Sequence, residues 1–536
     1  MKRIILLSIV AVCFYSCDSM LDIYPEDSVS KEVFFSDQND FDLALTGLYS
    51  GLRAKGANAD NGAYGGLLYW DVCADAMFFQ FSWHTPWYDI SAGNLNPNTS
   101  GIANIWSLLY SSINWANTII EQVDNNGNML DASFARSVKG EAHFVRAICY
   151  IRLTSLFGAV PMVDRLLTPT EAKLPRTSVN DVTNQLIIPD LNIAIDNLEE
   201  YPYGGKYGKA TKLSAMGMKV RAYLYNKDYA NTVAAAQELM ALENTSQYLS
   251  FLDNYKSIFA NDNENNPEIL FCIKYAAGGQ KEGSTFNTPF GSYIPGLSQG
   301  SMNGSWNSSI ITPEYIDSYY YIDGQYAETS RWYNPENPWS NRGPRFESTF
   351  YIGDYTVLPN GLLFEKSMVC VFNNDYIEKY PFNLNKGYMN EDSKIDWTDE
   401  DESDFIIIRY TDVLMMYAEA KTELNQIDET VYEILDRVRE RAGIDPVTRG
   451  QSQDQMRKTI QLERKLEFAF EGLRYFDIRR WGIADEVINS IKSDDAAEGG
   501  YNFGSTKKFN PANYLWPIPQ SAIDVNPNLL PNNQGY

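Results

Sequence analysis

A stretch near the C-terminus, residues 463–481, carries carboxylates and arginines at spacings that could do acid/base chemistry. Glu467, Glu471, Arg474, Asp477 and Arg480 follow one another at three or four residues, which places them on one face of a helix. In one interpretation the carboxylates act as general acid and base beside the arginines. In the other they form an ion-pair seam between packed helices, in which Arg474 pairs with Glu467 or Glu471 and Arg480 pairs with Asp477. Alternating charges favour the seam, because a neighbouring guanidinium lowers a carboxylate pKa rather than raising it.

Histidine and cysteine are too few and too scattered for catalytic metal chemistry. The only histidines are His84 and His143, and no HExxH or CxxC spacing occurs. We therefore expect no metal and no cofactor. Buried free thiols, or a single disulfide, are expected at Cys73, Cys149, Cys272 and Cys370.

The charge of the chain restricts its ligands. The formal net charge is −25 and the sequence pI is about 4.5, so the chain repels phosphate backbones and anionic head groups. Nucleic acid is excluded as a partner, and a neutral ligand fits best. Aromatic residues make up 14% of the chain, more than a core needs, so some of them are expected to face water and contact that ligand.

The N-terminus has the pattern of a secretory signal. Lys2 and Arg3 precede an apolar run at 4–12, which is too short to span a membrane, and Ser16 precedes Cys17. A cysteine directly after a small residue indicates bacterial lipoprotein processing. We predict a signal peptide at 1–16 and lipidation, with palmitate-type chains, at Cys17. Ordinary secretory cleavage is the alternative.

Apolar periodicity predicts a mostly α-helical protein. Two helices joined by a short turn, at 213–225 and 229–242, have the size of a tetratricopeptide repeat. Between 244 and 403 the sequence is rich in Gly, Pro, Asn and Tyr, with strand-like runs at 269–275 and 369–372, and reads as a functional insert. Further helices are predicted at 40–52, 104–123, 132–157, 177–198 (kinked at Pro189), 411–424, 431–441, 456–471 and 476–491, and the tail from Tyr514 is expected to lie extended over the body.

Aromatic residues in two loops are the candidate binding residues. A sugar ring has an apolar C–H face that stacks on a flat aromatic ring, and a hydroxyl rim that polar groups bind. The first loop supplies Trp83, Trp87 and Tyr88, and the second supplies Trp306, Trp332 and Trp339. Nearby rim partners are Asp75, Asn96 and Arg345. Core packing is the alternative for each tryptophan.

The chain resembles the SusD/RagB-type outer-membrane lipoproteins of Bacteroidetes. The similarity rests on Arg-Tyr-Thr-Asp-Val-Leu-Met-Met-Tyr-Ala-Glu-Ala at 409–420, on the 463–481 stretch, on Tyr-Leu-Trp-Pro-Ile-Pro at 514–519 and on the ending at 526–536. It covers the whole mature chain and is most specific in the C-terminal third.

This resemblance implies a SusD-like fold, in which tetratricopeptide-type helix pairs frame an irregular, loop-rich ligand-binding half. The implied regions are an N-terminal SusD-like helical region at 17–243 and a C-terminal RagB/SusD region at 244–536. It also implies a non-catalytic, glycan-binding lipoprotein on the cell outer membrane, which delivers oligosaccharide to a SusC-like TonB-dependent transporter. A peptide-binding lipoprotein of the same family and a glycoside hydrolase are the alternatives.

Overall fold

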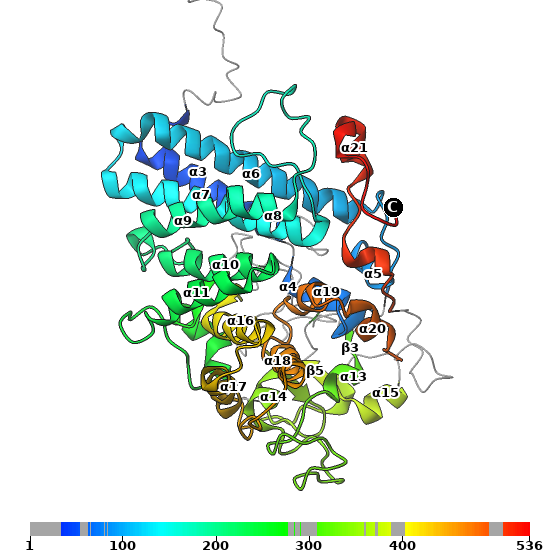
Figure 1. Ribbon diagram of the computed structural model, residues 1–536. Coiled ribbons are helices and arrows are strands. Elements are labelled where there is room, and N and C mark those ends of the chain that lie inside the picture. The colour runs from blue at the N-terminus through cyan, green and yellow to red at the C-terminus, as the bar shows by residue number, and fades with distance from the viewer. Residues whose placement is uncertain are drawn as a thin grey trace, which may run out of the picture.

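The computed structural model describes residues 34–53, 63–64, 66–79, 81–82, 84–276, 284, 290, 308–358, 361–369, 374–386, 403–492 and 507–536. Within these ranges the protein is mostly helical, as predicted, and its strands are short. Long helices form the upper layer in Figure 1, stacked helix pairs lie below them, and the irregular half lies at the bottom. The predictions for Cys17, Trp83, Trp306 and Cys370 concern residues outside the described ranges.

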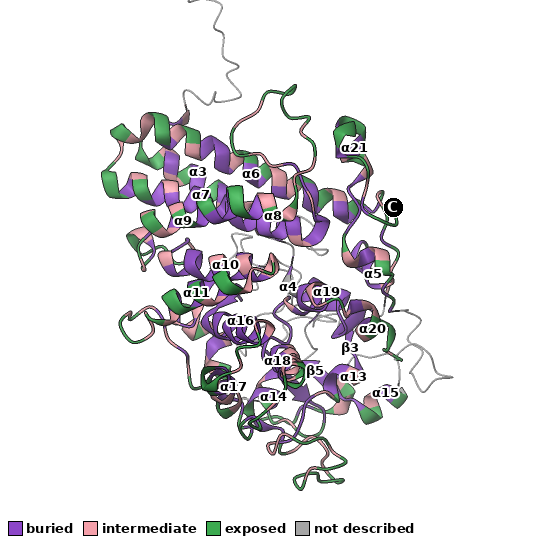
Figure 2. Cartoon of the chain, viewed as in Figure 1, coloured by how far each residue is buried: buried purple, intermediate pink, exposed green. Residues whose placement is uncertain are grey.

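The upper layer is built around one buried helix. This helix, α7 (Ala132–Phe157), packs against α3 (Gln38–Ser50), α6 (Ser100–Asn126) and α9 (Ile188–Asn197). It begins where the Asp131 side chain accepts hydrogen bonds from the first turn, and it ends at Gly158, whose φ is 72°. Both signals are local, and α7 has the predicted bounds. Figure 2 shows its buried residues over most of its length.

The helix predicted at 177–198 is continuous but irregular. It starts as α8 (Val179–Val182), passes through a π-helical turn (Thr183–Ile187) and continues as α9. Pro189 falls in the first turn of α9, where its missing N–H costs little. The π turn therefore replaces the expected kink.

Two antiparallel helix pairs stack below this layer. One pair is α10 (Lys212–Tyr225) and α11 (Tyr229–Met240), close to the predicted bounds, and the other is α16 (Tyr410–Glu423) and α17 (Glu429–Arg441). Helices α11 and α16 pack together (Figure 1). At Gly217 of α10 an added Cβ would lie 2.9 Å from a methyl carbon of Leu270, so a small residue is needed there.

The described residues of the irregular half form three two-stranded antiparallel sheets. They pair β1 (Met77–Phe79) with β3 (Ser309–Ile311), β2 (Ile269–Ile273) with β6 (Phe405–Arg409), and β4 (Phe350–Ile352) with β5 (Phe382–Leu384). Strand β2 confirms the strand predicted at 269–275. The run at 369–372 lies mostly outside the described residues. Among the described residues this half also has the short helices α13 (Pro313–Ile316), α14 (Gly343–Thr349) and α15 (Asn374–Lys379).

The C-terminal helices are shorter than predicted. Helix α18 (Gln453–Glu467) stops before Glu471, because Phe470 and Gly472 adopt φ values of 61° and 70° and turn the chain. The single helix predicted at 476–491 is two, α19 (Arg474–Arg480) and α20 (Ala484–Asn489), separated at Gly482 with φ 73°.

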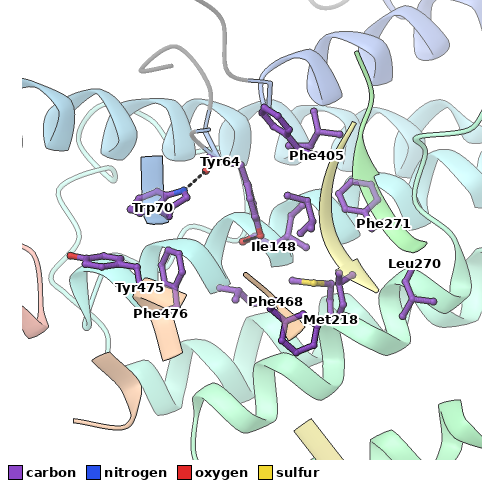
Figure 3. Packing of buried hydrophobic residues seen from close by; sticks show 14 of the residues in the cluster. Tyr64, Trp70, Ile148, Met218, Leu270, Phe271, Phe405, Phe468, Tyr475 and Phe476 are labelled. Atoms are coloured by element: carbon purple, nitrogen blue, oxygen red, sulfur yellow. Dashed lines mark hydrogen bonds between the residues drawn. The ribbon is translucent and has the colours of Figure 1, made fainter. Parts of the chain in front are cut away.

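The tail is part of the core rather than an extended cover. Trp516 is fully buried and packs on Trp70 of α4 (Leu67–Cys73), with ring centroids 5.7 Å apart. Figure 3 shows Trp70 beside Tyr475 and Phe476 of α19. The tail then forms the short helix α21 (Gln520–Val525).

Three further observations concern the described residues. No helix among them is long and apolar enough to cross a membrane. No group of three or more metal-ligating side chains occurs among them. Cys73, Cys149 and Cys272 are buried free thiols.

Candidate functional site

A buried ion-pair network, here the Glu467 network, surrounds the C-terminal end of α18. Glu467 lies at its centre. Its Oε1 accepts hydrogen bonds from Arg409 (3.0 Å) and Arg441 (2.7 Å), and its Oε2 accepts one from Arg345 (3.1 Å). The other members are Glu268, Lys386, Arg439, Glu463 and Glu471.

Electrostatics in this network favour ion pairing over proton transfer. Burial alone would raise the pKa of Glu467, but Arg441, Arg409 and Arg345 more than offset burial and hold that pKa well below its usual range. A carboxylate held ionised in this way is a poor general acid near neutral pH. The ion-pair interpretation of the 463–481 stretch is therefore confirmed.

The Glu467 network ties together elements that are distant in sequence. Arg409 ends β6, Arg441 ends α17, Arg345 lies in α14 and Lys386 follows β5. Glu471 accepts from Lys386 Nζ at 2.6 Å and from Arg409 Nε at 2.8 Å. The network thus joins the stacked helix pairs to the irregular half.

A second buried group of charges, the Asp412 network, locks α16, α18 and α19. Arg464 donates to Asp412 at 2.8 Å and to Asp477 at 2.9 Å, and Arg221 donates to Asp412 at 2.7 Å. The predicted pair of Asp477 with Arg480 is present at 2.8 Å. Arg480 also pairs with Glu419.

The pKa of Asp412 predicts acid sensitivity. Burial would raise this pKa, but Arg464 and Arg221 lower it from 3.8 to about 2. A depressed carboxyl pKa contributes stability that is present above the unfolded pKa and is lost as pH falls through the folded one. A shift of one pKa unit corresponds to about 1.4 kcal/mol, so the contribution of Asp412 to the free energy of unfolding falls by roughly 2 kcal/mol between about pH 4 and pH 2. Urea unfolding across this range should give a shallower pH slope for Asp412→Asn than for wild type. The control Asp454→Asn removes an 84% exposed carboxylate, and its slope should match wild type.

The sequence predicted that Arg474 pairs with Glu467 or Glu471, and this prediction is wrong. The turn at 470–472 directs the Arg474 side chain to Asp75 instead. Its Nε donates to Asp75 Oδ1 at 2.7 Å, and Lys465 lies 3.3 Å from the same carboxylate. Asp75 is buried in this cluster. Its predicted role as a rim partner for a ligand is therefore corrected.

Two other predicted ligand contacts lie in the interior. Trp87 has no exposed surface and packs edge-on against Trp70, with ring centroids 5.0 Å apart. Arg345 is 2% exposed and belongs to the Glu467 network. Neither side chain offers surface to which a ligand could bind. Both predictions are corrected: Trp87 is core packing, and Arg345 is scaffold.

The other predicted ligand contacts that the structure describes are half-buried or exposed. Trp339 is half-buried, edge-on to Phe382 at 4.7 Å. Tyr88 is half-buried, and Asn96 is exposed but bonds within its own turn. Trp83 and Trp306 lie outside the described residues, so the proposed arc with Trp332 remains a prediction.

Trp332 lies among other exposed aromatic residues. We call Tyr326, Trp332, Tyr333 and Tyr355 the aromatic surface; their exposed fractions lie between 40% and 43%. Three of them belong to the loop 322–341 below α14 in Figure 1, and the Tyr355 hydroxyl reaches the Glu336 carbonyl at 3.4 Å. From the second loop the sequence prediction took only tryptophans and overlooked these tyrosines, although the abundance of tyrosine was a usable signal.

The loop carrying the aromatic surface is closed and anchored. Ile322 N donates to the Asn341 carbonyl at 2.9 Å across its neck, and Asp323 accepts from Ser330 Oγ at 2.9 Å inside it. Arg342, at the start of α14, donates to the Tyr319 carbonyl at 2.7 Å. Since Arg345 follows in α14, the Glu467 network holds the base of this loop.

The chemistry of this surface suits a neutral, hydroxylated ligand. Exposed rings offer flat apolar faces, and the same loop carries amides and charged groups for a hydroxyl rim. The guanidinium of Arg331 lies 5.6 Å from the Trp332 ring centroid. Fixed rings lose little conformational entropy when a ligand stacks on them.

Solved structures share this fold. A SusD-like carbohydrate binding protein from Bacteroides fragilis aligns with a TM-score of 0.76 and 26% identity, covering 92% of this chain and 99% of that chain. A laminarin binding SusD-like protein aligns with a TM-score of 0.68 and 21% identity, covering 93% and 100%.

Sequence comparisons agree with the fold. SusD-like protein P25 of Formosa agariphila is 26% identical over 580 residues, covering 99% of both chains. Residues 22–224 match the model described as starch-binding associating with outer membrane, and residues 267–536, half of the chain, match the model of the SusD family. The chain belongs to the SusD family, whose members are carbohydrate-binding proteins of the outer membrane.

Proposed function

We propose that this protein is a cell-surface lipoprotein that captures oligosaccharide or polysaccharide and delivers it to a SusC-like TonB-dependent transporter. Family membership supports the carbohydrate class, and the relative from Bacteroides fragilis, at 26% identity, is described as carbohydrate binding. The observation that carries the proposal is the aromatic surface, held out from the fold on an anchored loop. The acidic net charge favours a neutral glycan over a sulfated one.

Trp332→Ala is expected to weaken glycan binding at least tenfold with little change in stability. A truncated, exposed tryptophan loses stacking area, and such anchor residues contribute about 2 kcal/mol or more to binding. Affinity gels with starch and laminarin, followed by a glycan array, measure the effect. We expect Trp83→Ala and Trp306→Ala to act in the same direction if the proposed arc exists.

The matched control for Trp332→Ala is Leu43→Ala on α3, which removes an exposed apolar side chain (62%) far from this loop in sequence. It should bind like wild type. Normal glycan binding by Trp332→Ala would show that the aromatic surface is not the site. Absence of binding to every glycan tested would contradict the proposed function itself.

Cys17→Ala is expected to release the protein from the membrane fraction. Lipid attachment at this cysteine is the proposed anchor. A protein without the cysteine lacks the lipid chains that would hold it in the membrane. Fractionation and labelling with a palmitate analogue measure retention. Cys13→Ala is the control and should remain membrane-bound, because Val12 is a bulkier residue than Ser16 at the position before cleavage. A membrane-bound Cys17→Ala protein would contradict the anchor.

Two alternatives remain testable. A peptide-binding role predicts binding in a peptide array and none in a glycan array. A glycoside hydrolase needs two carboxylates flanking the sugar bond, whereas the patterned carboxylates at 463–481 are paired with arginines. Release of reducing sugar from a bound polysaccharide would contradict a purely binding function.

A further inference from the structure

A cavity of about 120 Å³ lies beside the loop 199–212, which connects α9 to α10. This loop is on the left of Figure 1, whereas the aromatic surface is at the bottom, so the two features lie on different parts of the molecule. Three tyrosines are among the described lining residues, and we call them the tyrosine pocket: Tyr201, Tyr207 and Tyr248. Strand β2 and the residues before it supply the opposite wall.

The rings of the tyrosine pocket are exposed and pack on one another. Tyr201 is 37% exposed and Tyr207 is 49% exposed. The Tyr201 ring lies edge-on to the Tyr207 ring with centroids 5.8 Å apart, and its centroid is 5.1 Å from that of Tyr248. Each ring therefore limits the movement of its neighbour, and the uncovered ring faces offer flat apolar area to a ligand.

The loop that carries Tyr201 and Tyr207 is held close to the body of the protein. Lys212 N donates to the Glu199 carbonyl at 2.8 Å across its neck. At Gly208, with a φ of 89°, an added Cβ would lie 2.5 Å from Cγ of Lys274, the residue after β2. Only glycine lets the loop approach this closely in this conformation. The rings are thus preorganised, and a ligand that stacks on them costs little conformational entropy.

The charges that line the cavity are balanced and already partnered. The described lining contains two acidic and two basic residues, and the contacts are these: Glu200 with Ser246, Lys209 with Asp42, and Lys274 with both Glu264 and Asp404. An ionic ligand would have to displace one of these partners before it gained a counter-charge. The lining therefore favours a neutral ligand.

Gln247 and Asn265 supply polar groups in the lining that the protein itself does not use. Both residues are exposed, and neither side-chain amide has a hydrogen-bond partner among the described residues. An amide carries donors and an acceptor, which matches a hydroxyl group that can both accept and donate. Proline-rich peptides also stack on tyrosines, but a proline has no N–H for the amide oxygen. A hydroxylated ring fits this lining better.

We propose that the tyrosine pocket binds one sugar unit of a neutral glycan, at a second site separate from the aromatic surface. The sugar ring stacks on Tyr207 and Tyr201, and the amides of Gln247 and Asn265 bind its hydroxyl groups. A water molecule occupies about 30 Å³ in the liquid, so the cavity has the volume of about four waters and admits one sugar ring at most. The inference rests on the carbohydrate class of the proposed function, but not on the aromatic surface.

A second site on the same chain would increase the retention of a long glycan. Once one site is occupied, a chain that reaches the other site meets it at a high effective concentration. Binding to polysaccharide then exceeds the binding of a short oligosaccharide, without any additional contact at the aromatic surface.

Nitration of exposed tyrosines by tetranitromethane, measured for each residue by mass spectrometry of peptides, tests the proposal. The probes are maltotriose, laminaritriose, cellotriose and xylotriose, each added to the full chain at about 10 mM. At least one sugar should slow nitration of Tyr207 about threefold or more, which corresponds to a Kd of about 5 mM or tighter. This protection should persist in Trp332→Ala, because the two sites are separate.

Tyr326 and Tyr333, measured in the same digest, give the state of the aromatic surface. Protection there without protection of Tyr207 would overturn the second site and leave the proposed function standing. Protection at neither surface would also overturn the second site, and the glycan array would then decide the proposed function separately. Protection of Tyr207 by decaproline and by no sugar would assign the pocket to a peptide and overturn the proposal.

Variants connect the protection to the pocket. Gln247→Ala removes an amide but no ring, and should weaken binding at Tyr207 about threefold while Tyr326 stays protected as in wild type. Lys206→Ala is the matched control: it lies in the same loop, pairs with Asp42 at 2.6 Å and does not line the cavity, so its protection should match wild type. Equal protection in these two variants would overturn the proposed amide contact.

Tyr207→Ala, made in the Trp332→Ala background, tests the second site on affinity gels. Trp332→Ala should keep part of its retention by polysaccharide, and the double variant should lose that remainder. Because Tyr207 is an exposed side chain, the double variant should melt like Trp332→Ala. Equal retention of the single and double variants would overturn the second site.

Discussion

Glu467→Gln is expected to lower the free energy of unfolding by about 3–5 kcal/mol, because it removes one partner from a buried charge network. The carboxylate accepts from Arg409, Arg441 and Arg345, and no water-exposed surface remains around it. A glutamine keeps the shape but removes the charge, and its NH₂ group turns a donor toward guanidinium donors. Urea unfolding followed by circular dichroism at pH 7 measures the loss.

The control for this prediction is Glu429→Gln, which makes the same change in an exposed pair. The Glu429 side chain is 62% exposed and pairs with Arg449 at 2.8 Å. Such a surface pair contributes about 0–1 kcal/mol, so the control should unfold almost like wild type. A loss below about 1 kcal/mol for Glu467→Gln would mean that the network relaxes around the missing charge.

Local signals explain which elements could be predicted from the sequence. The Asp131 cap and Gly158 lie next to the residues they affect, and the bounds of α7 follow from them. The end of α18 could not be predicted in the same way, because Phe470 is a non-glycine residue with φ 61°. Positive φ at such a residue is uncommon and is imposed by packing.

Partner choice inside the networks is a long-range property. Arg345 meets Glu463 and Glu467 from 118 and 122 residues away, and no spacing rule along the chain predicts these contacts. The sequence indicated an ion-pair seam from the alternation of charge, and this was correct. The predicted pairing of Arg474 with Glu467 or Glu471 was wrong, because the spacing of charges along the sequence does not reveal the turn at 470–472.

The candidate site shows the same division between local and long-range information. Aromatic abundance indicated that some rings face water, and the aromatic surface has such rings. Which rings do so depends on burial by distant segments: Trp87 is covered by Trp70 and Tyr69, whereas Trp332 stays exposed. Residue type and loop position were therefore insufficient to choose between core and ligand contact.

Trp516→Ala is expected to lower the free energy of unfolding by about 3–5 kcal/mol, because it leaves a cavity where the tail joins the upper layer to α4 and α19. The fully buried indole packs on Trp70 and edge-on to Phe157, with ring centroids 5.7 Å and 5.8 Å away, and its Nε1 donates to the Tyr475 hydroxyl at 2.8 Å. These contacts join α7 of the upper layer to α4 and α19. Loss of the ring leaves a cavity, and Tyr475 loses its donor.

Three variants apportion this effect by urea unfolding and limited proteolysis. Trp516→Phe keeps a ring but loses the hydrogen bond, and should cost less than the alanine variant. Val525→Ala, in the same tail but 70% exposed, should stay within about 0.5 kcal/mol of wild type. If the tail joins α7 to α4 and α19, the Trp516→Ala protein should also be cleaved by protease after Tyr514 under conditions in which the rest of the chain is still folded. Equal protease resistance in Trp516→Ala and Val525→Ala would show that the remaining tail contacts suffice, including the bonds from Asn533 to the Phe157 and Trp516 carbonyls.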